Sequence, residues 1–135
     1  MGVPPFLVAS STQAIIAQRL LRRICKECKA EVEADPAICH AADITDEQIA
    51  ANKFYGGKGC PVCRGGGFRG RIAVYEIMVM NSRLRDLAFR VATTDQIREQ
   101  AIRDGMHTLM MDGVRKVFSG MSTVDEVLTV AKKTD

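Results

Sequence analysis

Residues 25–28 read Cys-Lys-Glu-Cys and residues 60–63 read Cys-Pro-Val-Cys, with 31 residues between the two pairs. A Cys-x-x-Cys turn lets two thiolates approach one metal ion from a single tight turn, and two such turns complete a tetrahedral cage of sulfurs. A structural zinc ion prefers this ligand shell. One pair is a weak signal, but two pairs in a chain of 135 residues predict a zinc site formed by Cys25, Cys28, Cys60 and Cys63.

Other uses of the cysteines fit the sequence less well. A redox dithiol of the thioredoxin kind needs a βαβ context, and neither pair has one. A catalytic zinc keeps an open position for water, which four thiolates do not leave, so we expect a structural metal. Cys39 and His40 lie between the pairs and could replace one cysteine of the cage, so their role stays open.

Composition narrows the class of protein. Hydrophobic residues make up 47% of the chain and aromatic residues 5%, which predicts an aliphatic core and favours helices over a β-sandwich. The number of cysteines is odd, and we find neither a secretory signal nor a membrane span. A reducing cytosol is therefore expected, where metal binding is favoured over disulfides.

The sequence divides into three segments, and together they predict a mainly α fold with a small β element, of the α+β class. Residues 1–24 are expected to form a helix. Residues 25–63 are expected to form the zinc-binding subdomain. Residues 64–135 are expected to form a strand followed by a helical C-terminal subdomain.

Local patterns support these segments. Ile16, Leu20 and Ile24 recur every four residues, which predicts one apolar stripe on the first helix. The capping box Thr45-Asp46-Glu47-Gln48 predicts a short helix between the cysteine pairs. The β-branched and aromatic content of Arg71–Met78 predicts a strand.

Cap residues and glycines predict four helices after that strand. The first starts near Ser82, and the second covers Ile97–Arg103 after a cap at Thr94 or Asp95. The third begins at Thr108 and directs Leu109, Val114, Val117 and Phe118 inward. The last follows a capping box at residues 123–126.

Residues 65–70 read Gly-Gly-Gly-Phe-Arg-Gly and match the pattern G-x-G-x-x-G. A dinucleotide site needs this pattern after a strand and at the start of a helix, because the helix N-terminus supports the pyrophosphate. Here the glycines follow a cysteine pair and precede a strand. We therefore interpret them as turn glycines.

Basic residues surround the cysteine pairs, so a zinc ribbon that binds nucleic acid is the alternative function. The formal charge is +3, from 19 basic and 16 acidic residues, and four thiolates with one zinc ion would bring it to about +1. Such a small charge and the shortage of stacking aromatic residues argue against nucleic acid as a partner. A solvated rim or a protein-docking surface is the preferred interpretation.

Several longer stretches occur in a fixed order around the cysteines. They are Met-Gly-Val-Pro-Pro-Phe-Leu-Val-Ala-Ser-Ser at 1–11, Ala-Gln-Arg-Leu-Leu-Arg-Arg-Ile-Cys at 17–25, Gly-Phe-Arg-Gly-Arg-Ile-Ala-Val-Tyr-Glu at 67–76, and Asp-Gly-Met-His-Thr-Leu at 104–109 with Asp-Gly at 112–113. This order resembles the C-terminal end of the type II secretion and type IV pilus assembly ATPases, the type II/IV secretion traffic ATPases. The resemblance covers nearly the whole chain.

The resemblance implies a function for the longer protein. It implies a RecA-like ATPase domain that carries the phosphate loop upstream, binds ATP and Mg²⁺, and ends with the helix of residues 1–24, with Met1 at an internal Met-Gly of the family. It also implies zinc on Cys25, Cys28, Cys60 and Cys63, a homo-hexamer at the cytoplasmic face of the inner membrane, and a membrane platform protein as partner.

The present chain contains no G-x-x-x-x-G-K-[ST] phosphate loop. We therefore assign no catalytic residue and expect no ATPase activity from this chain alone. Its expected role is structural and mechanical, transmitting movement in the motor. The residues do not distinguish protein secretion from pilus assembly.

Overall fold

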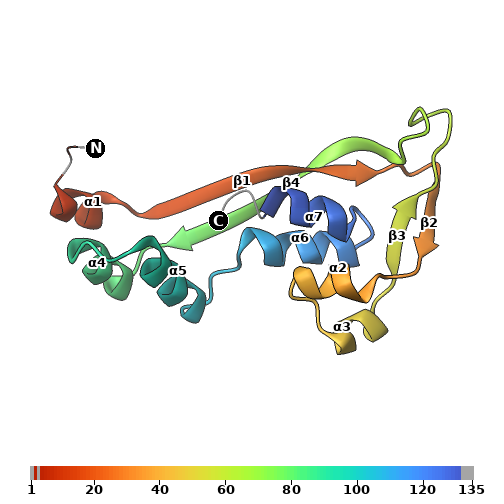
Figure 1. Cartoon of the computed structure of the whole chain (residues 1–135). Coiled ribbons are helices and arrows are strands. Elements are labelled where there is room, and N and C mark those ends of the chain that lie inside the picture. Colours follow the sequence, from red (N-terminus) through yellow and green to blue (C-terminus); the bar gives the residue numbers. More distant parts are fainter. Residues whose placement is uncertain (1, 3, 132–135) are drawn as a thin grey trace. The chain divides into compact units, whose positions relative to one another are not determined.

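Residues 2 and 4–131 are described by a computed structural model of the chain (Figure 1). Met1, Val3 and residues 132–135, which belong to the first and last expected segments, lie outside the described residues. The described residues form both helices and strands, with more residues in helices, so the expected α+β class is confirmed. The described elements are α1 (Pro5–Ser11), β1 (Ala14–Ile24), β2 (Lys29–Val32), α2 (Pro36–Ala41), α3 (Asp46–Ala51), β3 (Phe54–Gly57), β4 (Phe68–Val79), α4 (Ser82–Phe89), α5 (Thr94–Arg103), α6 (Leu109–Phe118) and α7 (Val124–Ala131).

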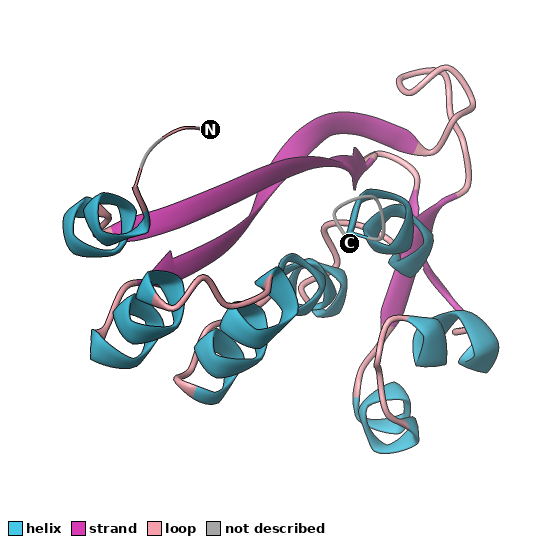
Figure 2. Cartoon of the chain, turned by 60° about the vertical axis from the view of Figure 1, so that its left-hand side comes forward, coloured by secondary structure: helices cyan, strands magenta, loops and turns pink. Residues whose placement is uncertain are grey.

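The two long strands β1 and β4 pair with each other, and Figure 2 shows them side by side. The Met80 N–H donates to the Gln13 carbonyl at one end, and the Cys25 N–H donates to the Gly67 carbonyl at the other, both at 2.9 Å. Residue numbers therefore increase along one strand as they decrease along the other, which makes the pair antiparallel.

This pairing corrects the helix expected over residues 1–24. Among the described residues of this segment, Pro5–Ser11 is helical and Ala14–Ile24 is a strand. Apolar residues four apart share one face of a helix, but they also share one face of a strand, because four is a multiple of the two-residue strand period. The distant partner β4, which local spacing does not reveal, decides in favour of the strand.

The chain divides into two compact units, described separately below. Unit 1 comprises residues 1–17 and 75–108, and unit 2 comprises residues 18–74 and 109–135. In unit 1, α4 packs against both α1 and α5. Arg85 of α4 donates to the Ala9 carbonyl at 2.8 Å, which satisfies one of the open carbonyls at the end of α1.

Unit 2 contains a short two-stranded antiparallel sheet, called the β2–β3 hairpin below, and two pairs of helices. Strands β2 and β3 are antiparallel, with Lys29 opposite Gly57 and Val32 opposite Phe54. The connection between them forms α2 and α3, and α6 packs against α7. The most deeply buried side chains of this unit are largely aliphatic and include Leu21, Ile24, Ile44, Val74, Val117 and Val127.

The expected helices of residues 82–131 are present, with small shifts. Helix α4 starts at Ser82 as expected. Helix α5 starts at Thr94, three residues before the expected Ile97, and its cap is Thr93 rather than Thr94 or Asp95. Leu109 and Val117 of α6 are buried as expected. None of the helices in residues 4–131 combines the length and the apolar character needed to span a membrane.

Candidate metal centre

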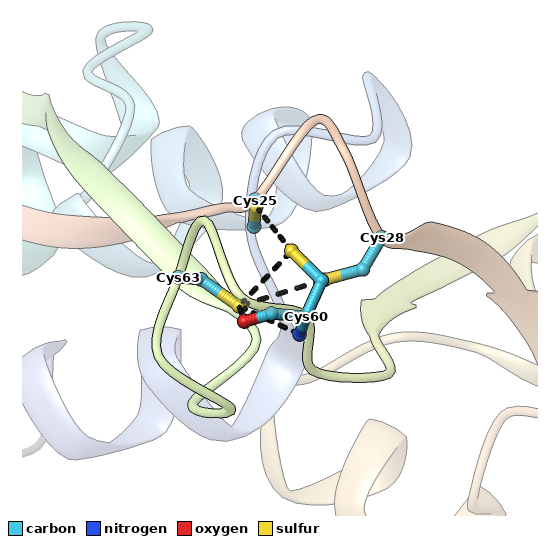
Figure 3. Close-up of side chains that lie close together, drawn as sticks. All are labelled: Cys25, Cys28, Cys60 and Cys63. Carbon is cyan, nitrogen blue, oxygen red and sulfur yellow. Dashed lines mark hydrogen bonds between the residues drawn. The ribbon is translucent and has the colours of Figure 1, made fainter.

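The four paired cysteines come from two connections between strands and converge on one point. Cys25 follows β1 and Cys28 precedes β2, whereas Cys60 and Cys63 lie in the connection from β3 to β4. Figure 3 shows their side chains gathered closely together, and all four Sγ atoms lie within 4.8 Å of one another.

The size of this cluster matches a tetrahedral metal site. The Sγ–Sγ distance is 3.8 Å between Cys25 and Cys60, and 3.7 Å for both the Cys28–Cys63 and the Cys60–Cys63 pairs. Four sulfurs placed about 2.3 Å from a central zinc ion would be separated by about 3.8 Å. The four cysteines could therefore hold one metal ion with little movement.

Two strand pairs bring the cysteines together. The β2–β3 register continues past Lys29 and Gly57, because the Lys58 N–H donates to the Cys28 carbonyl at 3.2 Å. The β1–β4 pair reaches the same point through the hydrogen bond from Cys25 to Gly67. The cluster thus lies where both antiparallel pairs end.

Close backbone packing beside the cluster requires glycine. A Cβ atom at Gly57 would lie 2.0 Å from the Gly67 carbonyl oxygen, and a Cβ atom at Gly67 would lie 2.6 Å from the Gly57 carbonyl oxygen. Gly67 also has a φ of +81°, a conformation that residues with a side chain rarely adopt. These two residues let the second cysteine pair lie against the hairpin.

Residues 65–67 make turns, as expected from the sequence. The Gly65 N–H donates to the Cys60 carbonyl at 3.0 Å, and the Gly66 N–H donates to the Cys63 carbonyl at 3.3 Å. Strand β4 begins at Phe68, so no helix N-terminus follows the glycines. The structure therefore agrees with the turn interpretation and not with a dinucleotide site.

Backbone N–H groups affect the charge state of two of the thiols. Burial raises the pKa of Cys28 to about 11, although the Gly59 N–H donates to its sulfur at 3.3 Å. Burial acts in the same direction at Cys63, but the N–H groups of Cys60 and Gly67, at 3.2 and 3.3 Å, outweigh it and lower the pKa to about 6. Backbone N–H groups therefore stabilise the Cys63 thiolate, and a bound cation would favour deprotonation of the other three thiols of the cluster.

Cys39 and His40, which the sequence left open as ligands, lie outside this cluster. Cys39 is buried in α2, and burial is the main cause that raises the pKa of its thiol. The His40 side chain is half exposed, and its Nε2 lies 2.6 Å from the Asp46 carboxylate.

A polar contact near the cluster was not expected from the sequence. The Glu126 carboxylate on α7 accepts three hydrogen bonds from Arg22, one from its backbone N–H and two from its guanidinium, each at 3.0 Å. The guanidinium carbon also lies 4.3 Å from the centre of the Phe68 ring. The Glu126 N–H donates to the Thr123 hydroxyl, which is one of the two hydrogen bonds of the expected capping box. The Glu126 carboxylate accepts from Arg22.

Neighbouring hydrogen bonds extend this contact toward Cys25. Ser122 donates to the Arg22 carbonyl at 2.8 Å, and the Ile24 N–H donates to the Met121 carbonyl at 2.9 Å. Cys25 is the next residue along the chain. No local pattern could have revealed these contacts, because their partners are about a hundred residues apart in the sequence.

Comparison with known proteins gives matches along nearly the whole chain. Residues 1–129 match the family described as "Type II/IV secretion system protein". The chain is 37% identical over 128 residues to the type IV pilus assembly ATPase PilB of Thermus thermophilus and 39% identical over 129 residues to PilB of Myxococcus xanthus. It is 35% identical over 133 residues to the type II secretion system protein E of Pseudomonas aeruginosa.

These alignments cover very different shares of the two partners. They include 95%, 95% and 98% of the present chain, but only 14%, 23% and 26% of the three relatives, in the same order. The chain therefore spans about a quarter or less of the length of these relatives.

Proposed function

This chain belongs to the type II/IV secretion system protein family, and from this membership we propose that it is the zinc-binding C-terminal portion of a motor ATPase. The motor would power type II protein secretion or type IV pilus assembly, as the names of the relatives state for them. The observation that carries the proposal is the cluster of four sulfurs within 4.8 Å, in a chain that matches this family over residues 1–129.

The proposed metal is one zinc ion held by Cys25, Cys28, Cys60 and Cys63. Four thiolates in a tetrahedral arrangement suit zinc, which needs no redox partner and prefers sulfur ligands at this spacing. Because the four sulfurs fill the tetrahedral shell, the ion has no position left for water or substrate. Its role is therefore to stabilise the fold.

The mechanical role follows from what the cluster joins. The ion would fasten the end of β1 to the start of β4 and to the β2–β3 hairpin, so that strands distant in sequence move together. Residues just before Cys25 are in turn bound to Ser122 and Glu126 near and within α7. A displacement of β1 would thus be passed to α7.

The remaining functions belong to the rest of the proposed motor. ATP and Mg²⁺ would bind a RecA-like domain outside this chain, and six subunits would assemble at the cytoplasmic face of the inner membrane. The zinc-bearing segment would then pass nucleotide-driven movement to a neighbouring subunit or to a membrane platform protein.

The test replaces Cys60 and Cys63 by serine in the full-length motor. We expect the variant to lose its bound zinc, measured by elemental analysis, and to lose secretion or pilus assembly and part of its ATPase rate. Cys39→Ser is the matched control, because Cys39 is a cysteine outside the cluster and should leave the zinc content unchanged. Normal assembly and secretion by a zinc-free motor would contradict the proposed role, and iron in place of zinc would contradict the metal.

A further inference from the structure

The second cysteine pair presents a small apolar surface to solvent. Pro61 and Val62, between the two cysteines, are both exposed, and Val62 keeps 44% of its surface accessible. The exposed basic residues Lys58 and Arg64 flank them. We call these four residues the knuckle tip.

Backbone hydrogen bonds across the turn order the part of the knuckle tip that carries Pro61, Val62 and Arg64. The Arg64 N–H donates to the Pro61 carbonyl at 3.4 Å, and the Gly65 N–H donates to the Cys60 carbonyl at 3.0 Å. A surface that is already ordered loses little conformational entropy when it binds. An exposed valine on a rigid turn with two cations beside it has the chemistry of an anchor for an acidic, apolar site.

Unit 2 also contains a site of that complementary kind. A pocket of about 170 Å³ lies among β2, β3, α2, α6 and α7, and apolar side chains that include Ile38, Phe54, Val117 and Val124 line it. Three exposed carboxylates stand around it, those of Glu33, Asp35 and Asp125. We call this site the acidic pocket.

Two of these carboxylates are available for a partner. Asp35 accepts a hydrogen bond from the Ala37 N–H, since it caps α2. Within residues 2 and 4–131, neither Glu33 nor Asp125 forms an ion pair. The same is true of Lys58 and Arg64 of the knuckle tip.

The two surfaces lie at opposite ends of one hairpin. The Lys29–Gly57 end of β2–β3 adjoins the cysteine cluster, and the Val32–Phe54 end lines the acidic pocket. The hairpin therefore separates the tip from the pocket, and one chain cannot bring its own tip into its own pocket. A contact between these surfaces requires a second copy.

We propose that the knuckle tip of one copy docks into the acidic pocket of a second copy of this chain. Val62 enters the pocket, while Lys58 and Arg64 meet Glu33 and Asp125. Because the two patches differ, the contact is head-to-tail, so repetition closes a ring or extends a filament. This proposal concerns assembly and does not depend on ATP hydrolysis.

The test measures self-association of the zinc-loaded chain by sedimentation velocity over a wide range of concentrations. The unchanged chain should associate as its concentration rises. Val62→Asp and Asp125→Lys should each weaken that association by about tenfold or more, since each removes a central anchor or a facing charge. Zinc content should stay at one ion per chain in both variants, which separates lost docking from lost folding.

An equimolar mixture of the two variants gives the sharpest result. Val62→Asp keeps an intact pocket and Asp125→Lys keeps an intact tip, so the mixture should form a dimer and stop there. The matched control is Val79→Asp, an exposed valine of unit 1 that belongs to neither surface. A chain that stays monomeric at all concentrations, a mixture that stays monomeric, or a Val79→Asp variant that loses association as fully as Val62→Asp would overturn the proposal.

Discussion

Gly67 lies between the second cysteine pair and β4, and both its backbone conformation and its close packing depend on its having no side chain. Its φ is +81°, and a Cβ atom would lie 2.6 Å from the Gly57 carbonyl oxygen. Its N–H donates to the Cys63 sulfur at 3.3 Å. Its carbonyl accepts from the Cys25 N–H, so one residue connects both cysteine pairs.

We predict that Gly67→Ala lowers both the stability of unit 2 and its affinity for zinc. Left-handed backbone costs an alanine about 1–2 kcal/mol, and the clash with Gly57 adds to it because the neighbouring atom is backbone and cannot turn away. Gly70→Ala is the matched control, since Gly70 has a φ of +82° but nothing within 4 Å of its Cβ position. Urea unfolding of the two zinc-loaded variants should show the larger loss for Gly67→Ala, and equal losses would mean that the close packing adds nothing.

The four cysteines that gather at the candidate site could be predicted from the sequence, but their surroundings could not. Cysteine spacing shows which residues can share a metal ion, because two residues between a pair allow one tight turn. The close approach of Gly57 and Gly67 and the N–H donors to Cys63 depend on how two strand pairs meet. The sequence does not indicate such backbone contacts, except that glycine stands at the positions of closest approach.

At the scale of elements, Gly113 sets the distance between α6 and α7. A Cβ atom there would lie 2.7 Å from Cγ1 and 3.0 Å from Cγ2 of Val127, which is fully buried. Glycine inside a helix normally destabilises it by about 0.5–1 kcal/mol relative to alanine. Here the packing requirement overrides that preference.

We predict that Gly113→Ala is destabilising, opposite in sign to the usual effect in a helix. Overpacking of a close contact costs about 1–3 kcal/mol, which exceeds the propensity gain. Adding Val127→Ala makes room for the new methyl group, so the double variant should lose less stability than the sum of the two single variants. Thermal unfolding of all four chains measures this, and strictly additive losses would contradict the packing explanation.

The contact between β1 and α7 should make stability depend on pH. Burial by itself would raise the pKa of Glu126, but the hydrogen bonds and the charge of Arg22 outweigh burial and lower this pKa below its ordinary value of 4.5. A carboxyl group whose pKa is lowered by folding stabilises the folded state above its ordinary pKa. That contribution is lost as the pH falls through the lowered value.

We therefore predict that Glu126→Gln costs about 1 kcal/mol at neutral pH, a modest value because Arg22 is largely exposed. The difference in unfolding free energy between the two chains should shrink as the pH falls below about 4.5. Urea unfolding at a series of pH values measures this difference. Glu47→Gln, which changes an exposed carboxylate of α3, should show no comparable loss, and a Glu126 difference that is independent of pH would exclude the charge as its cause.

Elements with local signals were predicted well, and elements that depend on distant partners were not. The capping box at Thr45 and the helix start at Ser82 follow from hydrogen bonds within four residues, so the sequence shows them directly. Strand β1 was mistaken for a helix because its apolar spacing fits both periods. The hairpin strands β2 and β3 have four residues each, too few to give a periodic signal.

At the scale of the whole molecule, the proposed metal ligands are distributed unequally between the two units. All four cysteines belong to unit 2, where they close the connection that contains the hairpin, α2 and α3. Unit 1 has polar contacts of its own. Asp104 accepts hydrogen bonds from Asn81 at 2.8 Å, Arg83 at 3.0 Å and Gln100 at 3.1 Å, which joins α4 to the end of α5.

Removal of the metal should consequently affect the two units to different degrees. Without a cation, four thiols within 4.8 Å lose the charge that favours their thiolates, and the end of β1 and the start of the hairpin are no longer fastened. We predict that a chelator increases amide hydrogen exchange in β2, β3 and α7 by about tenfold or more, because Glu126 of α7 and the two residues Met121 and Ser122 before it are hydrogen-bonded to residues 22 and 24, just before Cys25. Helices α4 and α5 should change much less, and re-adding zinc should restore the slow exchange. Equal acceleration in both units would show that the metal stabilises the chain as one cooperative body, and no acceleration in α7 would show that its contact with β1 does not depend on the cluster.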